Sequence, residues 1–275
     1  MKISLRTIID TARNPAFNMA ADLFLLKSCI NHTTIFVRFY QWSPASITIG
    51  LMQDASAMLD FPAMKQNNVA WVRRPTGGRA VLHENDVTYS CIFPATIVEM
   101  GKSIMETYRI ISQCLMEGLN RIGIPCVSCD STNALRETKR ELKLPCFLAP
   151  NRNEIMVDGK KLVGSAQKRT AEAILQHGSI PLTNAYRKLP DYLKLPEVQR
   201  SRQKKLLEEK SVCMEDLNQT LSAPSVIGAL GKGFRTCLPF KAEEIPWSEK
   251  EMSEISLQAK SESFRKQWFS PCYSI

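Results

Sequence analysis

Apolar and polar residues alternate along the chain in two ways, which predict short strands in groups and longer helices between the groups. β-Branched and aromatic residues concentrate in short runs bounded by turn residues, as is typical of strands. Apolar residues at helical spacing predict helices over 14–30 and 101–123, the second ending at Gly123. The predicted strands cover 33–42, 46–50, 69–74, 79–83, 87–93, 153–157, 160–167 and 173–182.

Turn residues between these runs predict two hairpins. Asp158-Gly159 has the composition of a type I′ turn, so the strands on either side of it should pair. The runs 79–83 and 87–93 should also pair as antiparallel strands, through a turn at 84–86.

The C-terminal part of the chain, from about residue 200, is predicted to be mainly helical. It contains a short predicted strand near 237–240 and a final predicted helix over 248–269. Hairpins with helices between the groups indicate an α+β fold, with mixed or antiparallel sheets flanked by helices. A doubly wound parallel sheet is not expected, because its strands would alternate singly with helices.

Composition and charge narrow the function classes. The chain has 275 residues, 44% hydrophobic and 23% charged, which is ordinary for a globular protein with a sizeable core. We expect a cytoplasmic location, because no secretory signal pattern opens the sequence and no run approaches the roughly 18–20 apolar residues of a membrane span. The net charge of +9 favours acidic partners. Its most basic run, 200–210, includes glutamates at helical spacing and is better interpreted as a solvated helix face, so we expect no nucleic acid partner.

The cysteines do not predict a disulfide scaffold or a metal centre. Nine are spread over the chain, and most should be free thiols in the core. Cys126 and Cys129 form a C-x-x-C pair, but a structural zinc site needs two further ligands. No second pair and no paired histidines are present, so we expect no metal.

A first motif, RRPTGGRAVLH over 73–83, combines adjacent glycines with arginines. Gly77 and Gly78 let the backbone approach a ligand closely, while Arg73, Arg74 and Arg79 surround them. Such a turn suits a phosphate or a pantetheine-type group. A glycine hairpin with solvated arginines is the alternative. The sequence contains neither the P-loop motif of nucleoside triphosphatases nor the glycine fingerprint of dinucleotide-binding folds.

A second motif joins a cysteine to a lysine on the predicted 158–159 hairpin. Cys146 precedes the hairpin, and Lys161 begins the strand that continues with the small residues Gly164 and Ser165. A lysine there could hold a carboxylate, a phosphate or an acyl carbonyl, and it could favour the thiolate of a nearby cysteine. The residues alone leave open that Cys146 is a buried core residue.

Both motifs resemble a known enzyme family. RRPTGGRAVLHENDVTYS and GKKLVGSAQKR, with ILQHGSI after it, closely resemble the lipoate-protein ligase and octanoyltransferase family, whose fold is related to that of biotin protein ligases. CFLAP, at 146–150, is similar to the element that distinguishes cysteine-dependent octanoyltransferases. The resemblance covers nearly the whole chain. It implies one catalytic domain over 1–275 with a biotin/lipoate protein ligase-like fold and a helical portion over about 200–275.

The resemblance also implies an acyl transfer without a cofactor. Cys146 would take an octanoyl group from acyl carrier protein as a thioester, and Lys161 would favour the thiolate and hold the acyl carbonyl. The acceptor would be a lysine of a lipoyl domain, such as glycine cleavage H protein or a 2-oxoacid dehydrogenase E2, and the enzyme would be a monomer. The substrate-binding residues would be Arg74, Gly77, Gly78, His83, Gly164, Ser165, His177 and Gly178.

Two departures and three alternatives accompany this hypothesis. Residues 151–154 lack the aromatic residues usual after the cysteine element, and Glu84 stands where aspartate is common. Both bear on acyl-chain preference. A lipoate-protein ligase would use ATP and Mg²⁺, with Lys161 holding an acyl-adenylate and no need of Cys146. A lipoyl amidotransferase would look almost the same as the transferase, and a non-catalytic binding module is the third alternative.

Overall fold

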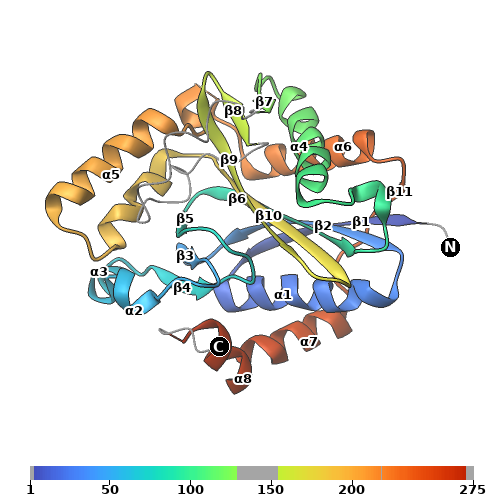
Figure 1. Ribbon diagram of the computed structural model, residues 1–275, viewed down its shortest axis with the longest axis horizontal. Helices are drawn as coiled ribbons and strands as arrows, with labels where there is room; N and C mark the ends of the chain where they lie inside the picture. Colours follow the sequence, from blue (N-terminus) through green and yellow to red (C-terminus); the bar gives the residue numbers. More distant parts are fainter. Residues whose placement is uncertain (1–2, 129–153, 218, 271–275) are drawn as a thin grey trace.

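A computed structural model describes residues 3–128, 154–217 and 219–270. Within these residues a large sheet has the strand order β11-β1-β2-β6-β10-β9-β8-β7, and a small sheet has the order β4-β3-β5 (Figure 1). In the large sheet β1 is parallel to both β2 and β11, whereas β6, β10 and β9 pair antiparallel. The large sheet comprises β1 (Ser4–Arg13), β2 (Thr34–Trp42), β6 (Asp86–Pro94), β7 (Val127–Ser128), β8 (Ile155–Val157), β9 (Lys160–Arg169), β10 (Ala173–Pro181) and β11 (Lys241–Glu244).

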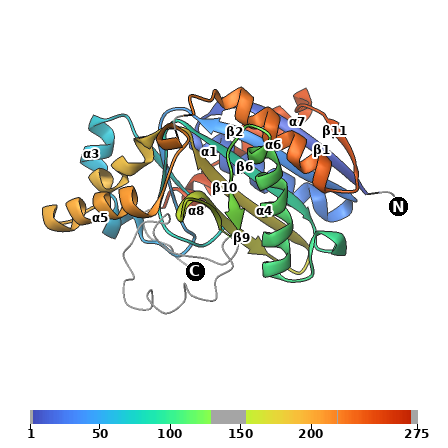
Figure 2. The ribbon, with the colours of Figure 1, turned by 90° about the horizontal axis from the view of Figure 1, so that it is seen from above.

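Helices cover both faces of the large sheet (Figures 1 and 2). The period-two alternation of β2 explains why. Val37 and Phe39 pack in one apolar cluster with residues of α4 and α6. Phe36 packs on the other face against Leu25 of α1, and α7 lies against α1 from outside. The helices are α1 (Pro15–Ser28), α4 (Ile104–Asn120), α5 (Glu197–Lys210), α6 (Ala223–Cys237), α7 (Glu249–Lys260) and α8 (Glu262–Trp268).

The small sheet has a separate apolar core. Ile47 and Ile49 of β3 pack with Leu82 of β5 and Leu189 of the 3-10 helix η4. β3 is parallel to β4 and antiparallel to β5. The elements around this core are β3 (Ser46–Ile49), β4 (Ala70–Arg73), β5 (Val81–His83), α2 (Ala55–Met58), α3 (Phe61–Gln66) and η4 (Asn184–Tyr192).

The predicted pairing of 79–83 with 87–93 is wrong. β5 pairs with β3 in the small sheet, whereas β6 lies between β2 and β10 in the large one. Asn85 has φ 53°, a left-handed conformation that turns the chain out of the first sheet. Every residue of β6 is buried, which is consistent with its central position between two strands. Pairing with β5 alone would leave one edge of β6 exposed. Strands of both sheets therefore lie on either side of one pocket.

Most other predicted elements are confirmed. Asp158 (φ 49°) and Gly159 (φ 75°) form the left-handed turn between β8 and β9, as expected for type I′. The α+β class with mixed sheets is also confirmed. β1 was not predicted, and the final helix is interrupted at Ser261, whose side chain caps α8 by accepting from the Phe264 amide. The remaining short 3-10 helices are η1 (Cys29–Asn31), η2 (Val98–Met100) and η5 (Glu215–Leu217).

Two further expectations concern the chain as a whole. No helix among the described residues is both long and apolar enough to cross a bilayer. The single domain over 1–275 stays a prediction. Its C-terminal portion contains α5, α6, α7 and α8, with β11 adding a parallel edge strand to the large sheet.

Candidate active site

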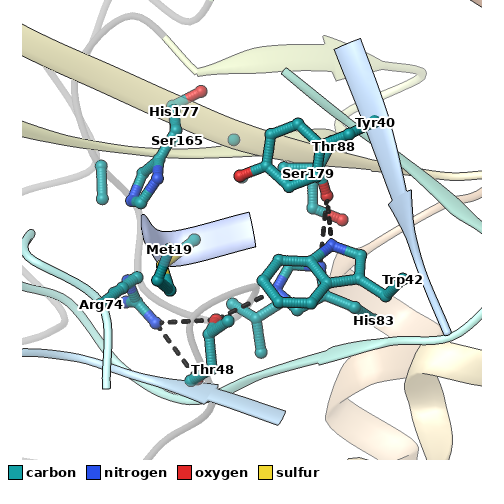
Figure 3. Close-up of a pocket in the computed structure, with 14 residues that line it drawn as sticks. Met19, Tyr40, Trp42, Thr48, Arg74, His83, Thr88, Ser165, His177 and Ser179 are labelled. Atoms are coloured by element: carbon teal, nitrogen blue, oxygen red, sulfur yellow. Dashed lines mark hydrogen bonds between the residues drawn. The ribbon is translucent and has the colours of Figure 1, made fainter. Parts of the chain in front are cut away.

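A pocket lies where the large sheet meets the small one. It encloses about 370 Å³ of space between protein atoms, part of which is open to solvent. Apolar side chains from α1 and several strands form much of its wall, and two histidines face it (Figure 3). Its lining residues are Met19, Tyr40, Trp42, Thr48, Arg74, Val81, His83, Thr88, Gly164, Ser165, Ala166, His177, Gly178 and Ser179.

The pocket brings together six of the residues that the sequence motifs single out. These are Arg74, His83, Gly164, Ser165, His177 and Gly178. Gly77 and Gly78 are exposed and do not line the cavity. Lys161 is buried but is not among the lining residues either. Cys146 lies outside the described residues.

His83 is fixed on one wall by a buried carboxylate. Its Nδ1 lies 2.8 Å from Oδ2 of Asp86, and its Nε2 lies 2.9 Å from Oγ1 of Thr48. The same Asp86 oxygen also accepts hydrogen bonds from Thr88 and Ser179. The ring of Trp42 stacks on the imidazole, with centroids 4.4 Å apart (Figure 3). These contacts leave the imidazole one orientation.

His177 is fixed on another wall by a second buried carboxylate. Its Nε2 lies 2.7 Å from Oγ1 of Thr76, and its Nδ1 lies 3.4 Å from Oδ2 of Asp22. Burial lowers the pKa of His177 despite the opposing effect of Asp22, so the imidazole is neutral near pH 7. Burial acts to raise the pKa of Asp22, but the hydrogen bond with His177 and the charge of Arg38 outweigh it. The net pKa is lowered and Asp22 is ionised.

Asp22 also connects the pocket to a buried ionic network. Arg38, which is fully buried, donates to Asp22 at 3.0 Å and to Asp10 at 3.0 Å. Tyr40, a lining residue, donates its hydroxyl to Asp22 at 3.0 Å. Burial, followed by the Asp22 charge, raises the pKa of Tyr40 well above its usual value, so the phenol stays protonated.

Arg74 supports the glycine turn from inside. Its guanidinium donates to the carbonyl oxygens of Gly77 at 2.8 Å and Arg79 at 2.7 Å. Gly78 has φ 91°, a conformation that side chains rarely adopt. A Cβ on Gly50 would come within 2.0 Å of the Gly78 carbonyl oxygen, so two backbone segments meet here at a distance that only glycine permits.

Small residues on β9 and β10 shape the adjoining wall. Gly178 pairs with Tyr89 on one side and Ser165 on the other. The Tyr89 hydroxyl lies 2.8 Å from Ser165 Oγ and accepts from Gln176 Nε2 at 3.1 Å. The tyrosine ring therefore fills the space that a side chain at 178 would occupy, and the Gly178 backbone faces the cavity.

Lys161 is held by a carboxylate that sequence reasoning did not include in the site. Its Nζ donates to Oε1 of Glu154 at 2.5 Å, and both side chains are almost fully buried. The Lys161 carbonyl accepts from the Val212 amide, which connects β9 to the segment after α5. Glu154 thus fixes the lysine within the sheet edge where β8 and β9 turn.

The cysteines that the structure describes are poor nucleophiles. Five of them are buried, and burial raises the pKa of Cys29 to about 12 and of Cys126 and Cys213 to about 11. Cys237 is exposed, and none of the described cysteines lines the pocket. The described residues contain no group of three or more acidic, histidine or cysteine side chains suited to a metal.

Comparison with known proteins places this geometry in one family. Residues 14–235 match the model of the lipoyl protein ligase A/B catalytic domain. The chain belongs to this family. A curated relative from Exiguobacterium sp. (strain ATCC BAA-1283 / AT1b), named octanoyltransferase LipM, is 37% identical over 90% of this chain and 91% of its own length.

Solved structures of the same family share the fold. A bipartite lipoate protein ligase from Thermoplasma acidophilum, studied with its E2 lipoyl domain, superposes with a TM-score of 0.79 at 23% identity, covering 100% of this chain and 99% of that one. A lipoate-protein ligase A bound with ATP superposes with a TM-score of 0.73 at 23% identity, covering 95% of each chain. The lipoate-ligase fold predicted from the motifs is therefore confirmed.

Several residues of the site were not expected from the sequence. Asp22 lies in a run whose apolar spacing predicts only a helix, and Tyr40 and Trp42 lie in a run that predicts only a strand. Arg38, Tyr40 and Trp42 occupy alternate positions of that strand and therefore share one face of it. A buried charge at Arg38 would have indicated that this face is a site, but the sequence alone does not show that Arg38 is buried. Thr48 and Thr76 carried no signal, because threonine is common in strands and turns.

Proposed function

We propose that this protein transfers an octanoyl group from acyl carrier protein to a lysine of a lipoyl domain, with Cys146 as the covalent carrier. The observation that carries the proposal is the pocket itself. Its wall combines Met19, Trp42 and Val81 with the small residues of β9 and β10, which suits a saturated acyl chain. The octanoyltransferase name of relatives that match over nine-tenths of the chain supports the same substrate.

The proposed reaction has two acyl transfers. The Cys146 thiolate attacks the thioester carbonyl of the carrier, a carbon–sulfur bond forms to Cys146, and the carrier leaves as a thiolate that takes up a proton. The neutral amine of the acceptor lysine then attacks the Cys146 thioester. It loses a proton, the amide forms, and Cys146 is released as a thiolate. No ATP is consumed, because each thioester retains the activation of the one before it.

Lys161 is the proposed partner of Cys146. Cys146 and Glu154 are eight positions apart in the sequence, and an extended chain of eight residues spans up to about 28 Å. Glu154 contacts Lys161 directly, so the distance along the chain allows the thiol to reach the ammonium. A cationic partner favours the thiolate form and can polarise the acyl carbonyl. Burial raises the thiol pKa of Cys29, Cys126 and Cys213, so these three cysteines are unsuited to the role of nucleophile.

The proposal extends to partners and location. The acceptor is a lipoyl domain such as that of glycine cleavage H protein or a 2-oxoacid dehydrogenase E2. The enzyme acts as a monomer in the cytoplasm, without a cofactor. Its net charge of +9 suits acidic carrier and acceptor proteins.

An ATP-dependent ligase reaction is the second candidate, favoured by the similarity to a ligase bound with ATP. The decisive assay measures octanoylation of a lipoyl domain in two arms, octanoyl-carrier protein without ATP and free octanoate with ATP and Mg²⁺. We expect activity in the first arm, its loss in Cys146→Ser, and full activity in the control Cys237→Ser, which changes an exposed thiol outside the pocket. Activity only in the second arm, unaffected by Cys146→Ser, would establish the ligase reaction instead.

A further inference from the structure

Arg74 uses its hydrogen-bonding capacity within the protein. It donates five hydrogen bonds to described residues, as many as a guanidinium has N–H groups. Nη2 donates to the carbonyl oxygens of Gly77 and Arg79. Nη1 donates to the carbonyl and the hydroxyl of Thr48, both at 3.2 Å, and Nε donates to Oγ1 of Thr76 at 3.2 Å. Arg74 is 4% exposed, so these bonds form away from water.

The first of two chains of hydrogen bonds runs from Arg74 to His83. Because Thr48 Oγ1 accepts a hydrogen from Arg74, its own hydrogen is available for Nε2 of His83, 2.9 Å away (Figure 3). On the other side of the ring, Nδ1 lies 2.8 Å from Oδ2 of Asp86, an oxygen that also accepts from the hydroxyls of Thr88 and Ser179. The chain therefore reads Arg74 to Thr48 to His83 to Asp86, with every hydrogen pointing the same way.

The second chain repeats this order on the other wall. Thr76 Oγ1 accepts from Arg74 Nε, so its hydrogen is available for Nε2 of His177, 2.7 Å away. Nδ1 of His177 faces Asp22 at 3.4 Å. The opposite tautomer would place the unprotonated Nδ1 against a carboxylate, two acceptors facing each other. Only the Nδ1–H form satisfies both contacts.

We infer that Arg74 is the positioning residue of this pocket, which sets both histidines as Nδ1–H tautomers through two threonine relays and holds the glycine turn. The motif alone favoured a different role, that of a cation waiting for an anionic group. The geometry assigns the guanidinium to the protein's own oxygens. In the proposed octanoyl transfer, on which the catalytic effect of this role rests, Arg74 keeps two Nε2 lone pairs and the 77–79 backbone in fixed positions around the acyl group.

The relays can be cut one at a time. Thr76→Val removes the hydroxyl that serves His177, and Thr48→Val removes the one that serves His83, while Thr→Ser at either position retains it. Arg74→Lys keeps a positive charge but loses the planar fork that reaches both threonines. These variants make a matched set, because each valine substitution should disturb one histidine and leave the other unchanged.

Ring-nitrogen NMR of ¹⁵N-histidine-labelled protein reads the tautomers directly. The sequence has three histidines, and the exposed His32 serves as an internal reference. We expect His83 and His177 to show a protonated Nδ1 and an unprotonated Nε2. Thr76→Val should alter only the His177 pattern, Thr48→Val only that of His83, and Arg74→Lys both. Serine at either position should restore the wild-type pattern. Unchanged histidine signals in Arg74→Lys would overturn the inference.

Kinetics separate positioning from substrate binding. Arg74→Lys should lower kcat for octanoyl transfer roughly 10- to 100-fold with a smaller change in KM, because misplaced groups slow the chemical step. As a control, Glu251→Gln alters a carboxylate held by Arg6 outside the pocket and should leave both constants unchanged. A rise in KM alone would show that Arg74 binds substrate. If wild-type protein transfers no octanoyl group but shows the expected tautomers, the proposed function fails and the positioning role stands.

Discussion

Substituting Gly178 by alanine adds one methyl group to the pocket wall and so tests how closely its neighbours pack there. A Cβ built at Gly178 lies 2.5 Å from the Gly164 carbonyl oxygen, 2.7 Å from Tyr89 Cε1 and 2.8 Å from Ser165 Oγ. The nearest of these atoms belongs to the backbone of β9, which pairs with β10 through this position. Tyr89 cannot easily withdraw, because its ring is fully buried and its hydroxyl is held by Ser165 and Gln176.

The expected cost follows from these three contacts. Forcing a methyl group into a packed interior costs about 1–3 kcal/mol. At about 2–4 °C per kcal/mol for a chain of this size, the melting temperature should fall by about 2–12 °C. Octanoyl transfer should fall as well, since relief of the clash requires β9 and β10 to separate beside the cavity. Thermal unfolding followed by circular dichroism measures the first effect, and the ATP-free transfer assay measures the second.

Substituting Gly228 by alanine should raise the stability of the protein, whereas the same substitution at Gly178 should lower it. Gly228 lies within α6, and a Cβ there would meet nothing within 4 Å. Alanine should stabilise this helix by about 0.5–1 kcal/mol, because glycine loses more backbone entropy on folding. If Gly178→Ala proved as stable as Gly228→Ala and retained full activity, the close packing of Tyr89 and Ser165 around Gly178 would be refuted.

Three further predictions follow from the buried charges and thiols. Glu154→Gln should destabilise the protein by about 3 kcal/mol, because it leaves the buried Lys161 ammonium without its carboxylate. Urea unfolding measures this loss, and a stability equal to that of the wild type would show that Glu154 does not hold the lysine. The pKa of His177 lies below its ordinary value of 6.5, so the unfolded chain alone takes up this proton as pH falls through 6.5, and stability decreases. His177→Gln should remove that part of the pH dependence of the melting temperature, and an unchanged pH dependence would contradict a neutral His177. Brief iodoacetamide treatment at neutral pH should label Cys146 before Cys237, as peptide mass mapping would show; the reverse order would argue against an activated thiolate at Cys146.

Helices and strands that depend on neighbouring residues alone could be predicted from the sequence. The left-handed dipeptide Asp158-Gly159 specifies its hairpin by itself, and the helices α1 and α4 follow from apolar periodicity. The partner of β5 did not follow, because alternation shows that a segment is a strand but not which strand it meets. The strand pairings show that the chain changes sheets between β5 and β6, where Asn85 has a positive φ.

The candidate site shows the same division between local and distant information. The motifs supplied the pocket residues His83 and His177, but not the carboxylates that orient them. Asp22 is separated from His177 by 155 positions, and only the packing of α1 on β10 brings them together. Arg74 lines the pocket, and its hydrogen bonds to described residues depend on a turn whose shape the glycines alone did not specify.

Intact-mass analysis of the protein, after brief mixing with octanoyl-carrier protein without ATP and without acceptor, can detect a covalent octanoyl group on Cys146. We expect a mass increase equal to one octanoyl group, mapped to Cys146, absent in Cys146→Ser, and removed on addition of a lipoyl domain. Transfer to the lipoyl domain by Cys146→Ser at the wild-type rate, with no adduct on the wild-type protein, would contradict a covalent octanoyl carrier at Cys146.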